Sequence, residues 1–133
     1  MRAFLRLTPN LVVRDIDRSL RFYCDVLDFE LDKHVPEKPP FVFASVRGGG
    51  VEIFLNDFNA ATEKYPNFAE VPVGGTLTLY LAMQGVDELY AHISGDGAKI
   101  LMPIETKFYG VREFAIADPD GYVITLAERV NNH

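Results

Sequence analysis

The chain has 133 residues, 48% apolar and 24% charged, which fits one ordinary globular domain and excludes a chain that is disordered throughout. Nineteen acidic residues against thirteen basic ones leave a net charge of −6, which argues against nucleic-acid binding. With no apolar run of the about 20 residues that span a bilayer, no signal-peptide pattern and a single cysteine, Cys24, we expect a cytoplasmic protein that does not bind membranes.

The first half of the chain predicts a strand, a helix and three more strands. Residues 5–13 end in β-branched side chains and are expected to form a strand. Asp15 is the expected N-cap of a helix whose apolar positions recur at helical spacing, at Ile16, Leu20, Tyr23 and Leu27. Asp28 is expected to end this helix in the left-handed conformation. Strands follow at about 29–35, 41–46 and 51–56, the last two joined by a turn over 47–50 with three glycines.

The second half repeats this order of elements. A strand is predicted over 76–83, and a helix begins near Gly85 with one apolar face made of Val86, Leu89, Tyr90 and Ile93. Gly95, Asp96 and Gly97 are expected to end that helix. Further strands are predicted at about 99–104, 112–117 and 122–128.

The two halves correspond at a nearly constant spacing. Ile16 and Val86 lie 70 residues apart, and the pairs Val51/Tyr122 and Phe43/Phe114 lie 71 apart. We interpret this as an α+β fold of two βαβββ repeats, at about 5–56 and 76–129, joined by a linker over 57–75 into a single domain of residues 1–133. Twisted sheets with helices outside would leave a cleft between the repeats, where a small ligand would bind.

Two segments resemble the vicinal oxygen chelate superfamily, which includes glyoxalase I, extradiol dioxygenases and bleomycin-resistance proteins. They are TPNLVVRDIDRSLRFYCDVLDFEL at residues 8–31 and GAKILMPIETKFYGVREFAIADPDGYVITLAE at residues 97–128. The resemblance implies paired βαβββ modules, a homodimer and a ligand site in the cleft. Pro9 and the stretch 109–114 are similar to the bleomycin-resistance-like branch, which binds ligands without metal.

The resemblance also indicates where metal-dependent members hold their ion. The corresponding positions carry Thr8, Phe54, Thr78 and Thr125. Neutral hydroxyls and a phenyl ring are not the imidazole and carboxylate ligands that such ions require. Glu52 shares a strand face with Phe54, but one carboxylate does not make a catalytic metal site. We therefore expect no metal and no other cofactor.

Polar residues on the two predicted first strands are the first candidate ligand contacts. Thr8 and Asn10 share one face of the first strand, and Thr78 and Tyr80 share one face of its counterpart. Their hydroxyl and amide groups would bond a polar organic molecule. The alternative is that these groups line a partly hydrated sheet face.

Aromatic and charged residues complete the candidate site. Flat ligands would stack on rings drawn from Phe41, Phe54, Phe108 and Tyr109, whereas Phe43 and Phe114 fit the core at least as well. Glu52 is a candidate general base or cation contact, and the alternative is an edge-strand charge that points to solvent or pairs with Arg47. Arg112 is a candidate ligand contact, and Glu113, on the other side of the same strand, is expected to form a structural ion pair.

These observations favour metal-independent binding and sequestration of a small, partly aromatic or cationic organic molecule by a homodimer, without catalytic residues. One alternative is a lyase or dioxygenase of the glyoxalase type with a divalent metal at non-standard positions, drawn from Glu52, His34 and Asn10. Another is an interaction module without a small ligand.

Overall fold

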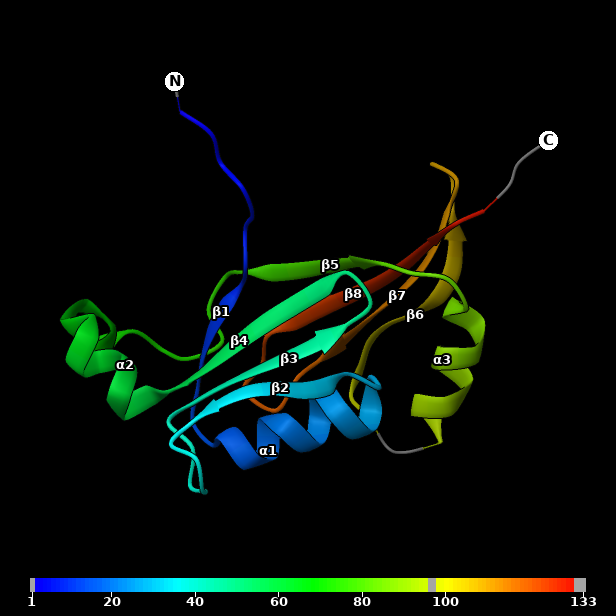
Figure 1. Ribbon diagram of the computed structural model, residues 1–133. Coiled ribbons are helices and arrows are strands. Elements are labelled where there is room, and N and C mark those ends of the chain that lie inside the picture. Colours follow the sequence, from blue (N-terminus) through cyan, green and yellow to red (C-terminus); the bar gives the residue numbers. More distant parts are fainter. Residues whose placement is uncertain (1, 96–97, 131–133) are drawn as a thin grey trace. The chain divides into compact units, whose positions relative to one another are not determined.

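The structure, a computed structural model, describes residues 2–95 and 98–130 (Figure 1). The chain divides into two compact units, Met1–Val71 and Pro72–His133. Each unit contains one four-stranded sheet. Asp96 and Gly97, expected to end the second helix, lie outside the described residues.

The first unit builds its sheet in the order β1-β4-β3-β2. Strand β1 runs parallel to β4, and the other neighbouring strands are antiparallel. The elements of this sheet and its helix are β1 (Asn10–Val13), α1 (Ile16–Leu20) with its π-helical continuation η1 (Arg21–Val26), β2 (Glu30–Val35), β3 (Phe43–Gly48) and β4 (Val51–Asp57).

Short-range signals fix both ends of the first helix. The side chain of Asp15 accepts a hydrogen bond from the backbone N–H of Arg18 at 3.2 Å, which confirms it as the N-cap. Asp28 adopts φ 61°, which confirms the left-handed residue after the helix. The predicted positions of helix and turn in this half are therefore correct.

The first strand is shorter than the sequence predicts. It was expected over 5–13 and runs only from Asn10 to Val13, where it pairs with β4. Pro9 has no N–H group to extend the ladder. The residues before it lie outside any strand, and Phe4, Leu5 and Leu7 are exposed.

The segment expected as a linker contains helix α2 (Phe58–Lys64) and the 3₁₀ turn η2 (Pro66–Glu70). The Asp57 carboxylate starts α2 by accepting hydrogen bonds from the backbone N–H groups of Asn59 and Ala60, at 3.1 and 3.3 Å. Seven residues are too few for helical periodicity to stand out, so the sequence pattern did not predict this helix.

The second unit repeats the topology of the first, with its sheet in the order β5-β8-β7-β6. Its α3 begins after Gly85, whose φ is 84°, and the Glu128 carboxylate accepts hydrogen bonds from the N–H groups of Gly85 and Val86 at 3.1 and 3.0 Å. The α+β fold of two βαβββ repeats is thus confirmed. The elements are β5 (Thr78–Ala82), α3 (Val86–Ser94), β6 (Ile100–Lys107), β7 (Val111–Ala117) and β8 (Val123–Arg129).

In each unit one sheet face packs against a helix and forms the core. In the first unit this face is fully buried against α1, through Leu11, Val13, Ala44, Val46, Ile53 and Leu55. In the second it is buried against α3, through Leu79, Phe114, Ile116, Ile124 and Leu126. We call the opposite face of each sheet, turned away from α1 or α3, its open face. Alternation along the strands gives the open faces a different chemistry from the core.

The spacing that equated Phe43 with Phe114 is wrong by one residue. Phe114 pairs with Leu126, is fully buried, and makes an edge-to-face contact with Tyr90 at 5.0 Å. Phe43 pairs with Asn56 and is only half-buried, on the open face. Ala44, opposite Leu55, takes the place of Phe114 in the first unit. A shift of one residue along a strand moves a side chain to the other face, so Phe43 leaves the predicted core.

Candidate functional site

An aromatic pair and an amide pair lie on the open face of the first unit. Phe54 on β4 is aligned with Asn10 of β1, and its ring contacts Phe43 at 5.2 Å between centroids in an edge-to-face arrangement. The Asn56 amide donates a hydrogen bond to the Asn10 side-chain oxygen. The face therefore offers half-buried aromatic carbon beside an amide group.

Thr8 and Phe41 lie outside the strands that build this face. Thr8 precedes β1 and is half-buried. Phe41, between β2 and β3, stacks on the ring of His34 at 4.4 Å. The ring Nδ1 of His34 lies 3.0 Å from the carbonyl oxygen of Pro36. The structure therefore groups Phe41 with a histidine rather than with Phe54.

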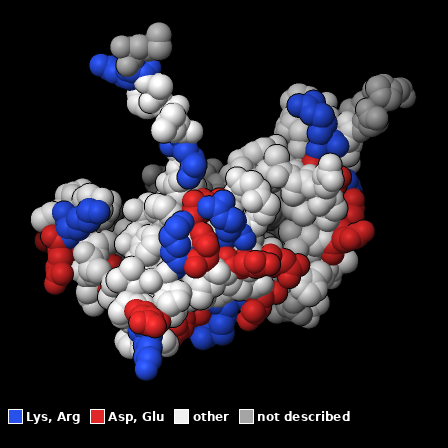
Figure 2. All heavy atoms as spheres, viewed as in Figure 1, with Lys and Arg blue, Asp and Glu red and all other residues white. Residues whose placement is uncertain are grey.

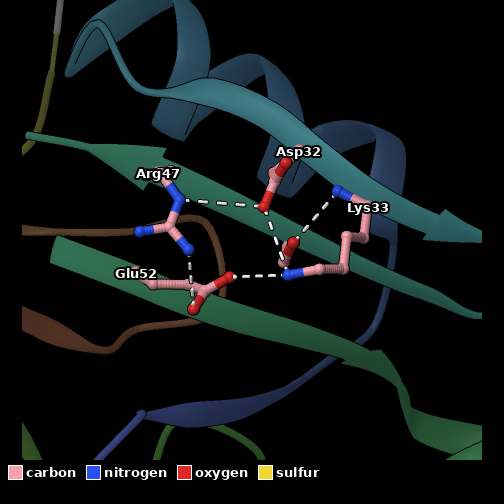
Figure 3. A network of polar contacts seen from close by, with 5 residues as sticks. Asp32, Lys33, Arg47 and Glu52 are labelled. Atoms are coloured by element: carbon pink, nitrogen blue, oxygen red, sulfur yellow. Dashed lines mark hydrogen bonds and ion pairs between the residues drawn. The ribbon is translucent and has the colours of Figure 1, made fainter.

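Glu52 is the centre of a network of opposite charges (Figure 3). Its side chain is 7% exposed; one oxygen lies 3.1 Å from Arg47 Nη2 and the other 3.3 Å from Lys33 Nζ. Asp32 lies 3.3 Å from Lys33 Nζ and 3.7 Å from Arg47 Nε. Hydrogen bonds to Asp32 and Glu52 raise the pKa of Lys33. Of the two interpretations of Glu52, the structure therefore shows the one in which it pairs with Arg47.

This network neutralises itself on the surface. Figure 2 shows basic and acidic side chains side by side on the face of β3 and β4 turned toward the viewer. Two cations oppose two carboxylates, and both Glu52 oxygens have a cationic partner. The backbone N–H of Lys33 also donates to Ser45 Oγ at 3.0 Å, which fixes β2 on β3. The charge of Glu52 is therefore paired within its own unit.

A surface hollow of about 260 Å³ opens at the turn end of the same strands. Asp32 and Arg47 of the network contribute to its wall, together with Asp28, Glu30, Leu31, Gly48 and Gly49. Its lining is mainly polar, and no residue predicted to bind a ligand lies in it.

The open face of the second unit carries exposed polar groups. Thr78 and Tyr80 on β5 are exposed, and Tyr80 is aligned with Thr125 of β8. Small residues share this face with them, namely Ala82 on β5 itself, Ala127 on β8, and Ala115 and Ala117 on β7. Thr78 and Tyr80 thus share a face, as Asn10 and Phe54 do in the first unit.

Tyr109 and Glu113 form a hydrogen bond on this open face. Tyr109 lies with Phe108 in the turn between β6 and β7, where Gly110 has φ 83°. The Tyr109 hydroxyl donates to Glu113 Oε1 at 2.9 Å. The hydrogen bond to Glu113 is the main cause that raises the pKa of Tyr109, and desolvation is the second. Phe108 packs edge-to-face on Tyr109 at 5.1 Å but is 99% exposed.

Arg112 points the other way, toward α3. Its Nε donates to both carboxylate oxygens of Asp87, at 2.9 and 3.0 Å, and Nη1 donates to Thr106 Oγ1 at 3.2 Å. The structural ion pair expected of Glu113 therefore belongs to Arg112, and Arg112 does not share a face with Tyr80 or Tyr109. The sequence contained a signal for this orientation: Phe114, two residues further along β7, is buried, and residues two apart on a strand share a face.

The positions that would hold a metal ion do not fit one. Phe54 and Thr125 occupy the same place in the two sheets, beside Asn10 and Tyr80. A phenyl ring and hydroxyl groups are not adequate ligands for zinc or iron. Among residues 2–95 and 98–130, no three His, Cys, Asp or Glu side chains cluster in a way that could hold an ion, and no helix is long and apolar enough to cross a membrane.

Comparison with known proteins decides the family. The model of the Glyoxalase/Bleomycin resistance protein/Dioxygenase superfamily matches residues 5–126. The chain belongs to this superfamily. Two curated relatives within it are the bleomycin resistance proteins of Geobacillus stearothermophilus and Staphylococcus aureus. Each is 31% identical over 133 residues, which cover 96% of this chain and 99% of the relative.

Solved structures agree with this fold of the superfamily. A member from Sphaerobacter thermophilus is 25% identical, with a TM-score of 0.74 over 96% of this chain and 98% of that one. TioX from Micromonospora is 20% identical, with a TM-score of 0.78 over 96% and 100% of the two chains. A protein of unknown function from Agrobacterium tumefaciens is 23% identical, with a TM-score of 0.79 over 98% of each chain. The last two establish the fold alone.

Proposed function

We propose that this chain binds a small, partly aromatic organic molecule on the open faces of its sheets, without a metal ion, and sequesters compounds of the bleomycin type. The observation that carries the proposal is the pair Phe54 and Thr125, which stand where metal-dependent members of the superfamily would need ligands. The identity of 31% to proteins named for bleomycin resistance supports the choice of compound.

The side chains of the open faces suit such a ligand. Half-buried rings such as Phe43 and Phe54 provide stacking surface that is already partly ordered by their mutual contact. On the first sheet the amides of Asn10 and Asn56 add donors and acceptors, and on the second sheet the hydroxyl of Thr125 does so. An apolar surface with few polar groups is typical of small-molecule sites.

A metal-dependent lyase or dioxygenase has no comparable support. Its best carboxylate, Glu52, has both oxygens engaged by Arg47 and Lys33. His34 stacks on Phe41, away from Asn10 in its own sheet. We therefore argue only the binding function.

The experiment is a titration of the chelator-treated protein with metal-free bleomycin in EDTA, followed by calorimetry and by the melting temperature. The proposal predicts saturable binding and a rise in melting temperature with ligand concentration, because a ligand that binds only the folded state stabilises it. Phe54→Ala should weaken binding, whereas Glu63→Gln, an exposed change on α2, is the matched control. Failure to bind, or binding only after zinc is added, would contradict the proposal.

We also propose that the chain forms a homodimer and confers resistance on a cell, and each of these features has its own test. Self-association into a homodimer is measured by light scattering across a range of protein concentrations. Resistance is measured by the bleomycin concentration that a bacterial host survives with and without the expressed chain, with Phe54→Ala as the comparison.

A further inference from the structure

Glu113 is a buried carboxylate without an ion-pair partner among residues 2–95 and 98–130. It is 7% exposed and lies on the open face of the second sheet, opposite Ala127 of β8. Its neighbours along β7, Arg112 and Phe114, point to the α3 side. Its hydrogen-bond partner is the Tyr109 hydroxyl, which reaches one of its two oxygens.

A carboxylate in this state favours a cation. Removing a charge from water is costly unless hydrogen bonds and an opposite charge replace the lost solvation. A single neutral phenol replaces only part of it. Glu113 is thus poised to gain more from an incoming cation than an exposed carboxylate would.

The cations nearest to Glu113 in sequence are already engaged. Lys107 forms an ion pair and a hydrogen bond with Glu105. This hydrogen bond is the largest cause of the raised pKa of Lys107, to which Glu113 makes a smaller contribution. Arg112 is bound to Asp87 on the other face. Among the described residues, Arg129 of β8, aligned with Val111 on the same open face, forms no ion pair with Glu113 either. Glu113 therefore remains open to a cation that a ligand supplies.

Two tyrosines share the open face with the carboxylate. Tyr109 is held beside Glu113 by their hydrogen bond. Tyr80, half-exposed on β5, lies close enough to Tyr109 to contribute to its raised pKa. Ring faces attract ammonium groups through the aromatic quadrupole, so carboxylate and rings favour the same kind of ligand. Beside Glu113, Ala115 on β7 and Ala127 on β8 are small, while Glu105 of β6 is paired opposite it.

We propose that Glu113, Tyr109 and Tyr80 form a subsite for a protonated amine carried by the ligand. The subsite rests on the proposed function and specifies a chemical group that the ligand must carry. Glu52, the carboxylate singled out from sequence, does not compete for this role, because Arg47 and Lys33 already neutralise it.

The test uses two probes of nearly equal size, 1-naphthylmethylamine, which is protonated at pH 7, and 1-naphthalenemethanol, which is neutral. Their affinities are measured by NMR titration of the isotope-labelled full chain, for the parent protein and for Glu113→Gln. The amide introduced by this substitution would keep an acceptor for the Tyr109 hydroxyl but lose the charge. Glu88→Gln, an exposed carboxylate on α3, is the matched control.

We expect the amine to bind the parent chain at least about tenfold more tightly than the alcohol, and Glu113→Gln to abolish that difference while the alcohol's affinity stays constant. Equal affinities of the two probes for the parent chain, an unchanged preference in Glu113→Gln, or binding of neither probe would each overturn the subsite. If Glu113→Gln does not fold, the amide shifts of the parent chain decide: the amine must perturb Glu113 and its neighbours on β7 and β8, and shifts elsewhere overturn the subsite. Bleomycin titrated into the same sample separates the two proposals: if bleomycin binds and the amine has no advantage, only the subsite fails.

Discussion

The Tyr109 hydroxyl donates a hydrogen bond of 2.9 Å to Glu113, a carboxylate that is 7% exposed. One residue earlier along β7, Arg112 forms a two-oxygen contact with Asp87 of α3. The strand thus separates a satisfied ion pair on its helix side from an uncompensated carboxylate on its open side.

Tyr109 is expected to titrate at higher pH than an ordinary tyrosine. Ionisation would place a phenolate against the Glu113 carboxylate and would break the hydrogen bond, so the pKa of Tyr109 is raised. The stabilisation from this bond is present below the ordinary pKa of about 10 and is lost as pH rises through the raised value. NMR of ¹³Cζ-labelled tyrosine, with Tyr109→Phe to assign the signal, measures the shift. Glu113→Gln should reduce it; an unchanged titration in that variant would mean that Glu113 is not its cause.

Gly48 should be intolerant of a side chain although its turn neighbour is not. A Cβ on Gly48 would lie 2.9 Å from the Phe29 ring, whereas a Cβ on Gly50 would meet nothing within 4 Å. Gly48→Ala should lower the free energy of unfolding by about 1–3 kcal/mol, because the ring must move. Gly50→Ala should change it by less than about 0.5 kcal/mol. Urea denaturation of the pair provides the measurement, and equal effects would contradict the packing of Phe29 on Gly48.

Two phenylalanines on opposite sheet faces should respond differently to truncation. Phe114→Ala removes a fully buried ring packed on Tyr90 and should cost about 3–5 kcal/mol in the free energy of unfolding. Phe54→Ala removes a half-buried ring from the open face and should cost clearly less, while it weakens binding of bleomycin. Denaturant melts and calorimetry on both variants test this. A loss of stability at Phe54 as large as that at Phe114 would assign Phe54 to the core.

The Glu52 network should contribute to stability rather than to ligand charge preference. Glu52→Gln leaves Arg47 and Lys33 with Asp32 as their remaining carboxylate, so we expect a loss of about 1–3 kcal/mol in the free energy of unfolding, which salt reduces. The preference for the amine probe over the alcohol should stay as in the parent chain. A lost preference in Glu52→Gln would move the cation subsite to the first unit.

Much of the fold was predictable because it depends on short-range patterns. The cap at Asp15, the left-handed residue Asp28 and the period of the two helices are each readable within a few residues. The prediction of two repeats rested in part on the spacing of 71 residues between Val51 and Tyr122, and this spacing correctly relates β4 to β8. The first strand was overestimated, because the end of a strand depends on its pairing partner, and Pro9 ends the ladder with β4.

The side-chain faces were harder to predict, because they depend on register. Phe43 was equated with Phe114 by a spacing that fails by one residue in β3 and β7, which reverses its face. The ion pair expected of Glu113 is formed instead by Arg112, whose side chain lies on the α3 side of β7. The partners of Glu52 come from two other strands, and only the pairing of β2, β3 and β4 brings Lys33 and Arg47 together around it.

The most direct test of the account is to map where metal-free bleomycin binds. Backbone amide shifts of the ¹⁵N-labelled chain, kept in EDTA, are followed during the titration. We predict that the largest shifts fall on the strands β1, β4, β5 and β8 that carry Asn10, Phe54, Tyr80 and Thr125. Shifts confined to α1 and α3, or none at saturating compound, would contradict binding on the open faces.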